Sequence, residues 1–322
     1  MKKLKVAVLM GGPSHEHDVS LRSGAKVLSG LAPERYEAFP VEISRECKWA
    51  VPHNELKVRG DVAFIAMHGT YGEDGTVQSI LDDAQIRYTG SSAAVSALAM
   101  NKFLSGRLFK RVGLSVPHTF LIPKTVWDGV DKLKVLRSAF QYVSSPCVVK
   151  PNNQGSSVGV RIIRNAEEFK GALDYAFTFS REALVQQFIH GREITCGVLD
   201  YGWPRSAFPL PPTEIVPVTS HFFDYKSKYE PGASEEITPA RLPQHLIRTI
   251  QQAALGAHRF IGARGFSRTD VILDKHGEVY VLEINTIPGL TEGSLLPKAA
   301  LVAGISFPRL LDIVIGASLQ GK

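Results

Sequence analysis

The residues best suited to chemistry stand on a predicted hairpin near the C-terminal end of the chain. Glu283 and Asn285 are two positions apart in one apolar strand, so their side chains point to the same face. With a turn at 274–277, Arg268 on the partner strand would lie opposite Glu283, and opposed residues share a face. Asp270, two positions from Arg268, then joins the same cluster.

Two carboxylates and an amide oxygen on one face are ligands that suit Mg²⁺ beside phosphates. In this register Asp270 lies opposite Val281, and a cation would relieve the repulsion between Asp270 and Glu283. The alternative is a salt-bridge ladder at the surface. The apolar residues between these charges favour a largely buried hairpin, where unpaired charges are costly.

A second candidate is the stretch KPNNQGSSVG at 150–159, where a lysine ends an apolar strand and a polar, glycine-containing loop follows. Ser156, Ser157 and exposed amide N–H groups could cradle phosphate oxygens, with Lys150 as the counter-charge. An ordinary glycine-serine hairpin turn is an equally simple interpretation of this stretch alone.

Glu16 and His68 come shortly after two apolar runs, 6–10 and 62–67, that read as buried strands. Ligands of open α/β sheets bind beyond the carboxyl ends of the strands. There Glu16 could hold a substrate ammonium and His68 a carboxylate. Each could equally be a solvated loop acid or a structural histidine.

In the first hundred residues, predicted strands alternate with predicted helices, and this order predicts a parallel sheet. No G-x-G-x-x-G follows the first strand and no G-x-x-x-x-G-K-[ST] occurs, so neither a dinucleotide nor a Walker site is supported. Further on, the patterns predict a helix at 92–112, strand pairs at 147–150 with 158–163 and 183–188 with 193–199, and a helix at 243–261.

Composition narrows the class of protein. The 322 residues are 44% apolar and 21% charged, which excludes a disordered chain, and three scattered cysteines exclude a disulfide scaffold. No apolar run reaches the roughly 18 residues of a membrane span, and the N-terminal apolar run is too short for a signal peptide. The net charge of +6 is dispersed, which favours a solvated surface over nucleic-acid binding and suits an anionic ligand such as a nucleotide.

Together these motifs resemble the D-alanine–D-alanine ligase family of the ATP-grasp superfamily. The similar stretches cover the chain from end to end, at 11–20, 67–75, 100–102, 150–159, 224–229, 268–273 and 282–297. The sequences GGPSHEHDVS and LEINTIPGLTEGSLLP are highly specific, whereas the glycine-serine loop alone indicates only the superfamily. The resemblance implies that ATP phosphorylates the carboxylate of one D-alanine. The amine of a second then attacks the acyl phosphate, giving D-alanyl-D-alanine for peptidoglycan.

The resemblance also assigns roles to individual residues. It implies that the nucleotide contacts are Lys102, Lys150, Ser157, Gln186, Glu193 and Lys228, and that two Mg²⁺ ions, replaceable by Mn²⁺, bind Asp270, Glu283 and Asn285. It implies that the catalytic groups are Glu16 for the first amine, Arg268 and the Gly289 amide for the oxyanion, Ser156, and Tyr229 bonding back to Glu16 and Ser156. It implies that the other substrate contacts are His68, Ser294 and the Leu295 amide.

The implied architecture is an α/β, ATP-grasp fold, with an N-terminal parallel α/β domain and two α+β domains clasping ATP. We expect boundaries at 1–100, 101–185 and 186–322. The long polar segment 221–242 is expected to be a lid that keeps water from the acyl phosphate. The family further implies a homodimer whose partners are ATP and D-alanine. The lack of an export signal, the dispersed charge and the lack of a long apolar run predict a cytoplasmic protein with no nucleic-acid or membrane partner.

The sequence departs from the family's pattern at one site residue, and three alternative functions stay open. Gln186 stands where the family usually carries glutamate against adenine, which puts in doubt the strength of base selection. A ligase of the same family making D-alanyl-D-lactate or D-alanyl-D-serine is the nearest alternative, and the intact Lys228-Tyr229 pair favours the dipeptide. A catalytically inactive nucleotide-binding module would lack a metal ligand or the oxyanion arginine, and a dinucleotide oxidoreductase would carry the glycine fingerprint.

Overall fold

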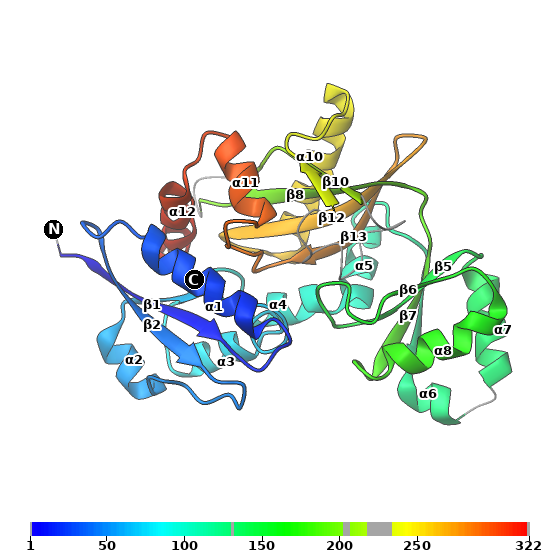
Figure 1. Ribbon diagram of the computed structural model, residues 1–322, viewed down its shortest axis with the longest axis horizontal. Coiled ribbons are helices and arrows are strands. Elements are labelled where there is room, and N and C mark those ends of the chain that lie inside the picture. The colour runs from blue at the N-terminus through cyan, green and yellow to red at the C-terminus, as the bar shows by residue number, and fades with distance from the viewer. Residues whose placement is uncertain (1, 130–131, 202–206, 218–233, 321–322) are drawn as a thin grey trace.

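The computed structural model describes residues 2–129, 132–201, 207–217 and 234–320 and contains three β-sheets (Figure 1). The first sheet is parallel, with β1 (Leu4–Gly11) between β2 (Tyr36–Ile43) and β3 (Val62–Ile65). Strands β1 and β3 are apolar because both of their faces are covered. The helices that follow these strands are α1 (His17–Gly30), α2 (His53–Arg59) and α3 (Thr76–Asp83), as expected for a parallel sheet.

The second sheet is antiparallel, in the order β4-β7-β5-β6. Its strands are β4 (Thr119–Pro123), β5 (Cys147–Pro151), β6 (Arg161–Ile163) and β7 (Glu182–Gln187). A separate apolar core joins this sheet to the helices α6 (Lys124–Gly129), α7 (Lys132–Tyr142) and α8 (Ala166–Ala176). Figure 1 shows this unit at one end of the molecule, with its helices on the outer side.

The third sheet has the order β11-β10-β8-β12-β13, and β9 (Phe208–Pro209) pairs with β8. Its strands are β8 (Gly191–Leu199), β10 (Thr213–Pro217), β11 (Ser234–Ile237), β12 (Phe266–Asp274) and β13 (Val279–Asn285). The amphipathic helix α10 (Gln244–Ile261) packs on one face and ends at Gly262, whose φ of +83° is the left-handed cap that glycine favours. The other face is left for the site.

The last two helices return to the start of the chain. Helices α11 (Leu295–Val302) and α12 (Phe307–Leu319) place Leu296, Leu310 and Leu311 in the same apolar core as the first sheet. Among the described residues no single helix is long and apolar enough to cross a membrane. These two pass that test only as a pair, which is bent by 106°.

The predicted helix 92–112 is wrong in one respect, because Asn101 divides it. The structure has α4 (Ala93–Met100) and α5 (Lys102–Arg111), and Asn101 between them has a non-helical ψ of 94°. Its side chain accepts a hydrogen bond from the Leu104 amide at 3.0 Å, which is the usual role of asparagine at a helix start. The break places Lys102 on the first turn of α5.

The prediction that strands 183–188 and 193–199 pair with each other is also wrong. They form β7 and β8, which lie in different sheets: β7 pairs with β4 and β5, and β8 pairs with β10 and β12. The residues between them lead from one sheet to the other, since Gly191 already pairs with Asp274 of the third sheet. The end of β7 therefore lies next to the start of β8, which pairs with β12 of the hairpin β12–β13.

The segment 221–242, the expected lid, contains regular structure in the part that the structure describes. Residues 234–237 form β11, an edge strand in antiparallel register with β10. Residues 218–233, including Lys228 and Tyr229, lie outside the described residues. The three sheets occupy residues 4–65, 119–187 and 191–285. The domain boundaries themselves stay predictions.

Candidate active site

The hairpin β12–β13 brings its charged residues together in a register that differs from the predicted one. Arg268 lies opposite Asn285, and Asp270 lies opposite Glu283, with a register shift just after Asp270. The turn and this bulge together move the pairing by two residues. Because strand side chains alternate with a period of two, the four side chains still share one face.

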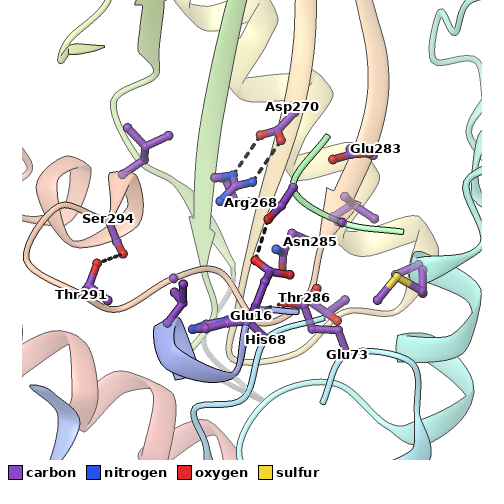
Figure 2. Close-up of a pocket in the computed structure, with 18 of the residues that line it drawn as sticks. Glu16, His68, Glu73, Arg268, Asp270, Glu283, Asn285, Thr286, Thr291 and Ser294 are labelled. Atoms are coloured by element: carbon purple, nitrogen blue, oxygen red, sulfur yellow. Dashed lines mark hydrogen bonds and ion pairs between the residues drawn. The ribbon is translucent and has the colours of Figure 1, made fainter. Parts of the chain in front are cut away.

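Arg268 and Asp270 form a two-point ion pair on that face (Figure 2). The Arg268 nitrogens donate to the two Asp270 oxygens at 2.9 and 3.0 Å, and the Thr195 hydroxyl donates to Asp270 at 2.7 Å. Burial opposes the charge on Arg268, but Asp270, followed by Glu283, outweighs it and raises the pKa of the guanidinium. Arg268 is therefore a fixed cation at every working pH.

Lys102 lies at the junction of the sheets. Its Nζ donates to the carbonyl of Gln154 at 2.6 Å and stands 3.3 Å from a carboxylate oxygen of Glu283. The first contact reaches the loop after β5, and the second reaches β13. Lys102 therefore brings a positive charge to the point where the second and third sheets face each other.

Two adjoining cavities collect nearly all the residues singled out from the sequence. The main cavity, of about 280 Å³, is lined by Glu16, His68, Lys102, Ser156, Glu193, Arg268, Asp270, Glu283, Asn285, Gly289, Ser294 and Leu295. The second cavity, of about 160 Å³, is lined by Lys102, Lys150, Ser157, Gln186, Glu193, Asp270 and Glu283. Four residues line both, so the two cavities meet at the hairpin. Lys228 and Tyr229 lie outside the described residues.

Glu16 connects the first sheet to the glycine-serine loop. The Ser156 hydroxyl donates to a Glu16 carboxylate oxygen at 2.6 Å. Ser156 and Ser157 both have positive φ, of 51° and 57°, a conformation that costs energy in residues other than glycine. A Cβ at Gly155 would lie 3.3 Å from Glu16, so the loop lies close over the carboxylate. Its contact with Glu16 holds the loop over the main cavity.

The His68 ring is held by three partners, none of which the sequence interpretation named. Its Nε2 lies 2.8 Å from the Ser23 hydroxyl, and its Nδ1 lies 3.1 Å from the Ile287 carbonyl and 3.5 Å from the Glu73 carboxylate. Glu73 is buried and lines the main cavity. The sequence feature that could have identified Glu73 is its position five residues after His68 in the same glycine-rich loop.

His68 and Glu73 influence each other's pKa. Burial lowers the pKa of His68, but the hydrogen bond and charge of Glu73, with the charge of Glu16, outweigh burial and raise it. Burial raises the pKa of Glu73, and Glu16 adds to that effect against the opposing contact with His68. The pair therefore favours a protonated imidazole beside the main cavity.

The loop before α11 closes the opposite side of the main cavity. Ser294 stands at the N-terminal cap position of α11, yet its hydroxyl lies 2.8 Å from the Thr291 hydroxyl. A Cβ at Gly289 would come within 2.7 Å of the Ser294 oxygen, so a side chain there would displace the Ser294 hydroxyl. Gly289, Ser294 and Leu295 at the start of α11 all line the main cavity. Figure 2 shows Ser294 and Thr291 together at one side of it.

The chemistry of the donor set fits a magnesium ion that takes part of its coordination from phosphates. Among the described residues, no three His, Cys, Asp or Glu side chains converge on one point. Asp270, Glu283 and Asn285 offer two carboxylates and an amide oxygen on one face. Mg²⁺ is commonly held by one or two carboxylates together with substrate phosphates, so this small set is sufficient.

Comparison with known proteins gives a consistent result. The family model for the N-terminus of D-ala D-ala ligase matches residues 5–60 and 50–91, and the model for its C-terminus matches 108–316. The D-alanine–D-alanine ligases of Geotalea uraniireducens and Geobacter sulfurreducens are 42% and 43% identical to the chain. These alignments cover 99% and 100% of this chain and 96% of each relative.

Solved structures agree in fold. The D-alanine–D-alanine ligase from Bacillus anthracis, complexed with ATP, superposes with a TM-score of 0.80 at 31% identity, covering 98% of this chain and 97% of that one. The VanG D-Ala:D-Ser ligase from Enterococcus faecalis gives a TM-score of 0.87 at 29% identity, covering 98% and 100%. The predicted ATP-grasp fold is therefore confirmed, and the chain belongs to the D-alanine–D-alanine ligase family.

Proposed function

We propose that the protein joins two D-alanines into D-alanyl-D-alanine at the expense of ATP, through an acyl phosphate on the first D-alanine. The observation that carries this proposal is the meeting of two cavities at one hairpin. One cavity suits a nucleotide and the other suits an amino acid, and Lys102, Asp270 and Glu283 line both. Membership of the family implies that the enzyme is an ATP-dependent ligase whose product is used in peptidoglycan synthesis.

The nucleotide is assigned to the second cavity, between the second and third sheets. Lys102 and Lys150 supply positive charge for the phosphates, and Ser156 and Ser157 supply the covering loop. Gln186 lines the same cavity and is assigned to the base, and Glu193 to the ribose. Lys228 is assigned to the phosphates by resemblance alone, since it lies outside the described residues.

Two Mg²⁺ ions are assigned to Asp270, Glu283 and Asn285, with Mn²⁺ as a substitute. Bound there, they would neutralise charge on the phosphates during transfer. The chain's own part is to hold the three ligands on one strand face. Isothermal titration of Mg²⁺ with ADP should detect this role, because Glu283→Gln should weaken the metal dependence of ADP binding without any turnover.

The amino-acid substrates are assigned to the main cavity. Glu16 is suited to the ammonium of the first D-alanine, with His68 beside the same substrate. Arg268 and the Gly289 amide are suited to the negative charge that develops when the second amine attacks, because preorganised donors stabilise such charge. Ser294 and the Leu295 amide, at the start of α11, are suited to the carboxylate of the second D-alanine.

The test measures ADP and product together. We expect ADP release that requires D-alanine and a divalent cation, with D-alanyl-D-alanine identified by mass spectrometry. Separate arms replace the second substrate by D-serine or D-lactate, and the dipeptide should dominate when D-alanine competes. Equal turnover with L-alanine, or a depsipeptide as the main product, would refute the proposal.

A further inference from the structure

The side chain of Gln186 is held from one side by Thr119. The two residues are directly opposed on the antiparallel strands β7 and β4, so their side chains share a face. The Gln186 Nε2 donates to the Thr119 hydroxyl oxygen at 2.9 Å. Gln186 is only 7% exposed, and it lines the second cavity. Its amide is therefore buried at the nucleotide end of the site.

The direction of this hydrogen bond follows from the second contact of Thr119. A threonine hydroxyl has one hydrogen, and Thr119 donates it to the Pro117 carbonyl at 3.0 Å. Towards Gln186, the Thr119 oxygen can then only accept, so it must face the amide nitrogen of Gln186. The Oε1 of Gln186 has no hydrogen-bond partner among the described residues, and it is the polar atom left to the cavity.

We infer that Thr119 is a positioning residue for base selection, and this inference rests on the proposed nucleotide site. By fixing the Gln186 amide, Thr119 makes Gln186 present an acceptor to the base. An acceptor matches the amino group at position 6 of adenine. It opposes the carbonyl at position 6 of hypoxanthine, because two acceptors face each other there and one buried group is left unpaired.

A glutamate at position 186 would need no such control. Both carboxylate oxygens accept, so turning the group changes nothing. A glutamine that turns over offers a donor instead, and would then receive a 6-oxo purine. The Thr119 hydroxyl fixes which end of the Gln186 amide faces the base, a choice that arises only because residue 186 is a glutamine.

The neighbouring contacts allow the hydroxyl to be tested by itself. The Gln187 amide donates to the His118 carbonyl at 2.8 Å, and the His118 amide donates to the Gln187 side chain at 3.2 Å. These bonds hold β4 against β7 without the Thr119 hydroxyl. Valine has nearly the shape of threonine and favours strands, so Thr119→Val removes the hydroxyl and keeps the strand.

The experiment compares binding of ATP and ITP, which differ at position 6 of the base, by calorimetry with Mg²⁺ and without D-alanine. The parent should prefer ATP. In Thr119→Val that preference should fall about tenfold, the size of one lost hydrogen-bond constraint. Thr119→Ser, which keeps the hydroxyl, should retain the parent preference. In a Gln186→Glu background, Thr119→Val should leave the preference unchanged.

Each outcome decides the inference. A folded Thr119→Val protein with the parent's preference would overturn it, as would a parent that binds ATP and ITP equally. Thr119→Ala serves as a second hydroxyl-free variant if valine disturbs folding. A protein that binds neither nucleotide would instead contradict the proposed function, so the two failures are distinguishable.

Discussion

Arg268 is held in place before any substrate arrives, because both of its bonds to Asp270 lie within the hairpin. Removing a preorganised donor of this kind typically costs about 10²–10³ in rate. We therefore expect Arg268→Ala to lower kcat by that factor while ADP binding changes little. Steady-state kinetics and calorimetry measure the two effects. Arg309→Ala, at an exposed ion pair on α12, is the matched control and should keep its rate. Near-normal turnover of Arg268→Ala would remove its assigned role.

The pairing of His68 with Glu73 predicts an unusual titration. The pKa of His68 is raised above its ordinary value of 6.5, so its favourable contact with Glu73 is fully present below pH 6.5 and is lost as pH rises through the folded-state pKa. NMR of ¹⁵N-labelled histidine should give a midpoint above 6.5. Glu73→Gln should lower it, whereas Glu34→Gln at an exposed position should not. A midpoint below 6.5 in the parent protein would contradict this account.

At the residue scale, the sequence predicted the charged face of the hairpin in spite of an incorrect register. Because strand side chains alternate with a period of two, a shift of two residues leaves them on the same face, and the turn and the bulge after Asp270 together shift the pairing by two. Glu73 was missed for a physical reason: its importance arises from burial against His68, which is a long-range property. Neither residue type nor local spacing reveals how deeply a loop carboxylate will lie.

At the scale of elements, the break at Asn101 sets the position of Lys102. Asn101→Ala removes the cap of α5, and losing such a cap typically costs about 1 kcal/mol of stability. We also expect the KM for ATP to rise, because Lys102 follows the cap directly. Urea unfolding and initial rates measure the two effects.

The control for Asn101→Ala is Asn165→Ala. Asn165 caps α8 in the same way, accepting from the Glu168 amide at 3.1 Å, but neither it nor its sequence neighbours line either cavity. It should lose similar stability with no change in KM. Equal KM changes in both variants would show that the cap of α5 has no special link to the nucleotide site.

Single elements were predictable where local pattern decides them, as for α10 and β1. What the sequence did not predict was the pairing of β7 and β8 with strands of other sheets. Both strands have apolar inner positions, and a pattern of burial is the same whichever partner covers it. The choice between a local hairpin and a crossing depends on distant strands such as β12, which lies about seventy residues further along the chain.

At the scale of the whole molecule, nucleotide binding should stabilise two sheets at once. The second cavity is lined by β5 and β7 on one side and by β12 and β13 on the other. A ligand at one hundred times its Kd adds about 2.7 kcal/mol to the free energy of unfolding. We expect ADP with Mg²⁺ to raise the Tm in thermal scans, and Lys150→Met to lose most of that shift. Adenosine, which lacks phosphates, should stabilise both proteins far less. An ADP shift that survives in Lys150→Met would contradict the phosphate assignment.

The most direct test of the account follows oxygen from D-alanine into phosphate. D-alanine labelled with ¹⁸O in its carboxylate is incubated with ATP, Mg²⁺ and the enzyme, and the released phosphate is examined by mass spectrometry. If ATP activates the carboxylate as an acyl phosphate, attack by the second amine expels phosphate that carries one ¹⁸O atom. We expect that label in step with D-alanyl-D-alanine formation. Dipeptide formed with unlabelled phosphate would contradict the acyl-phosphate route, and with it the roles assigned to the two joined cavities.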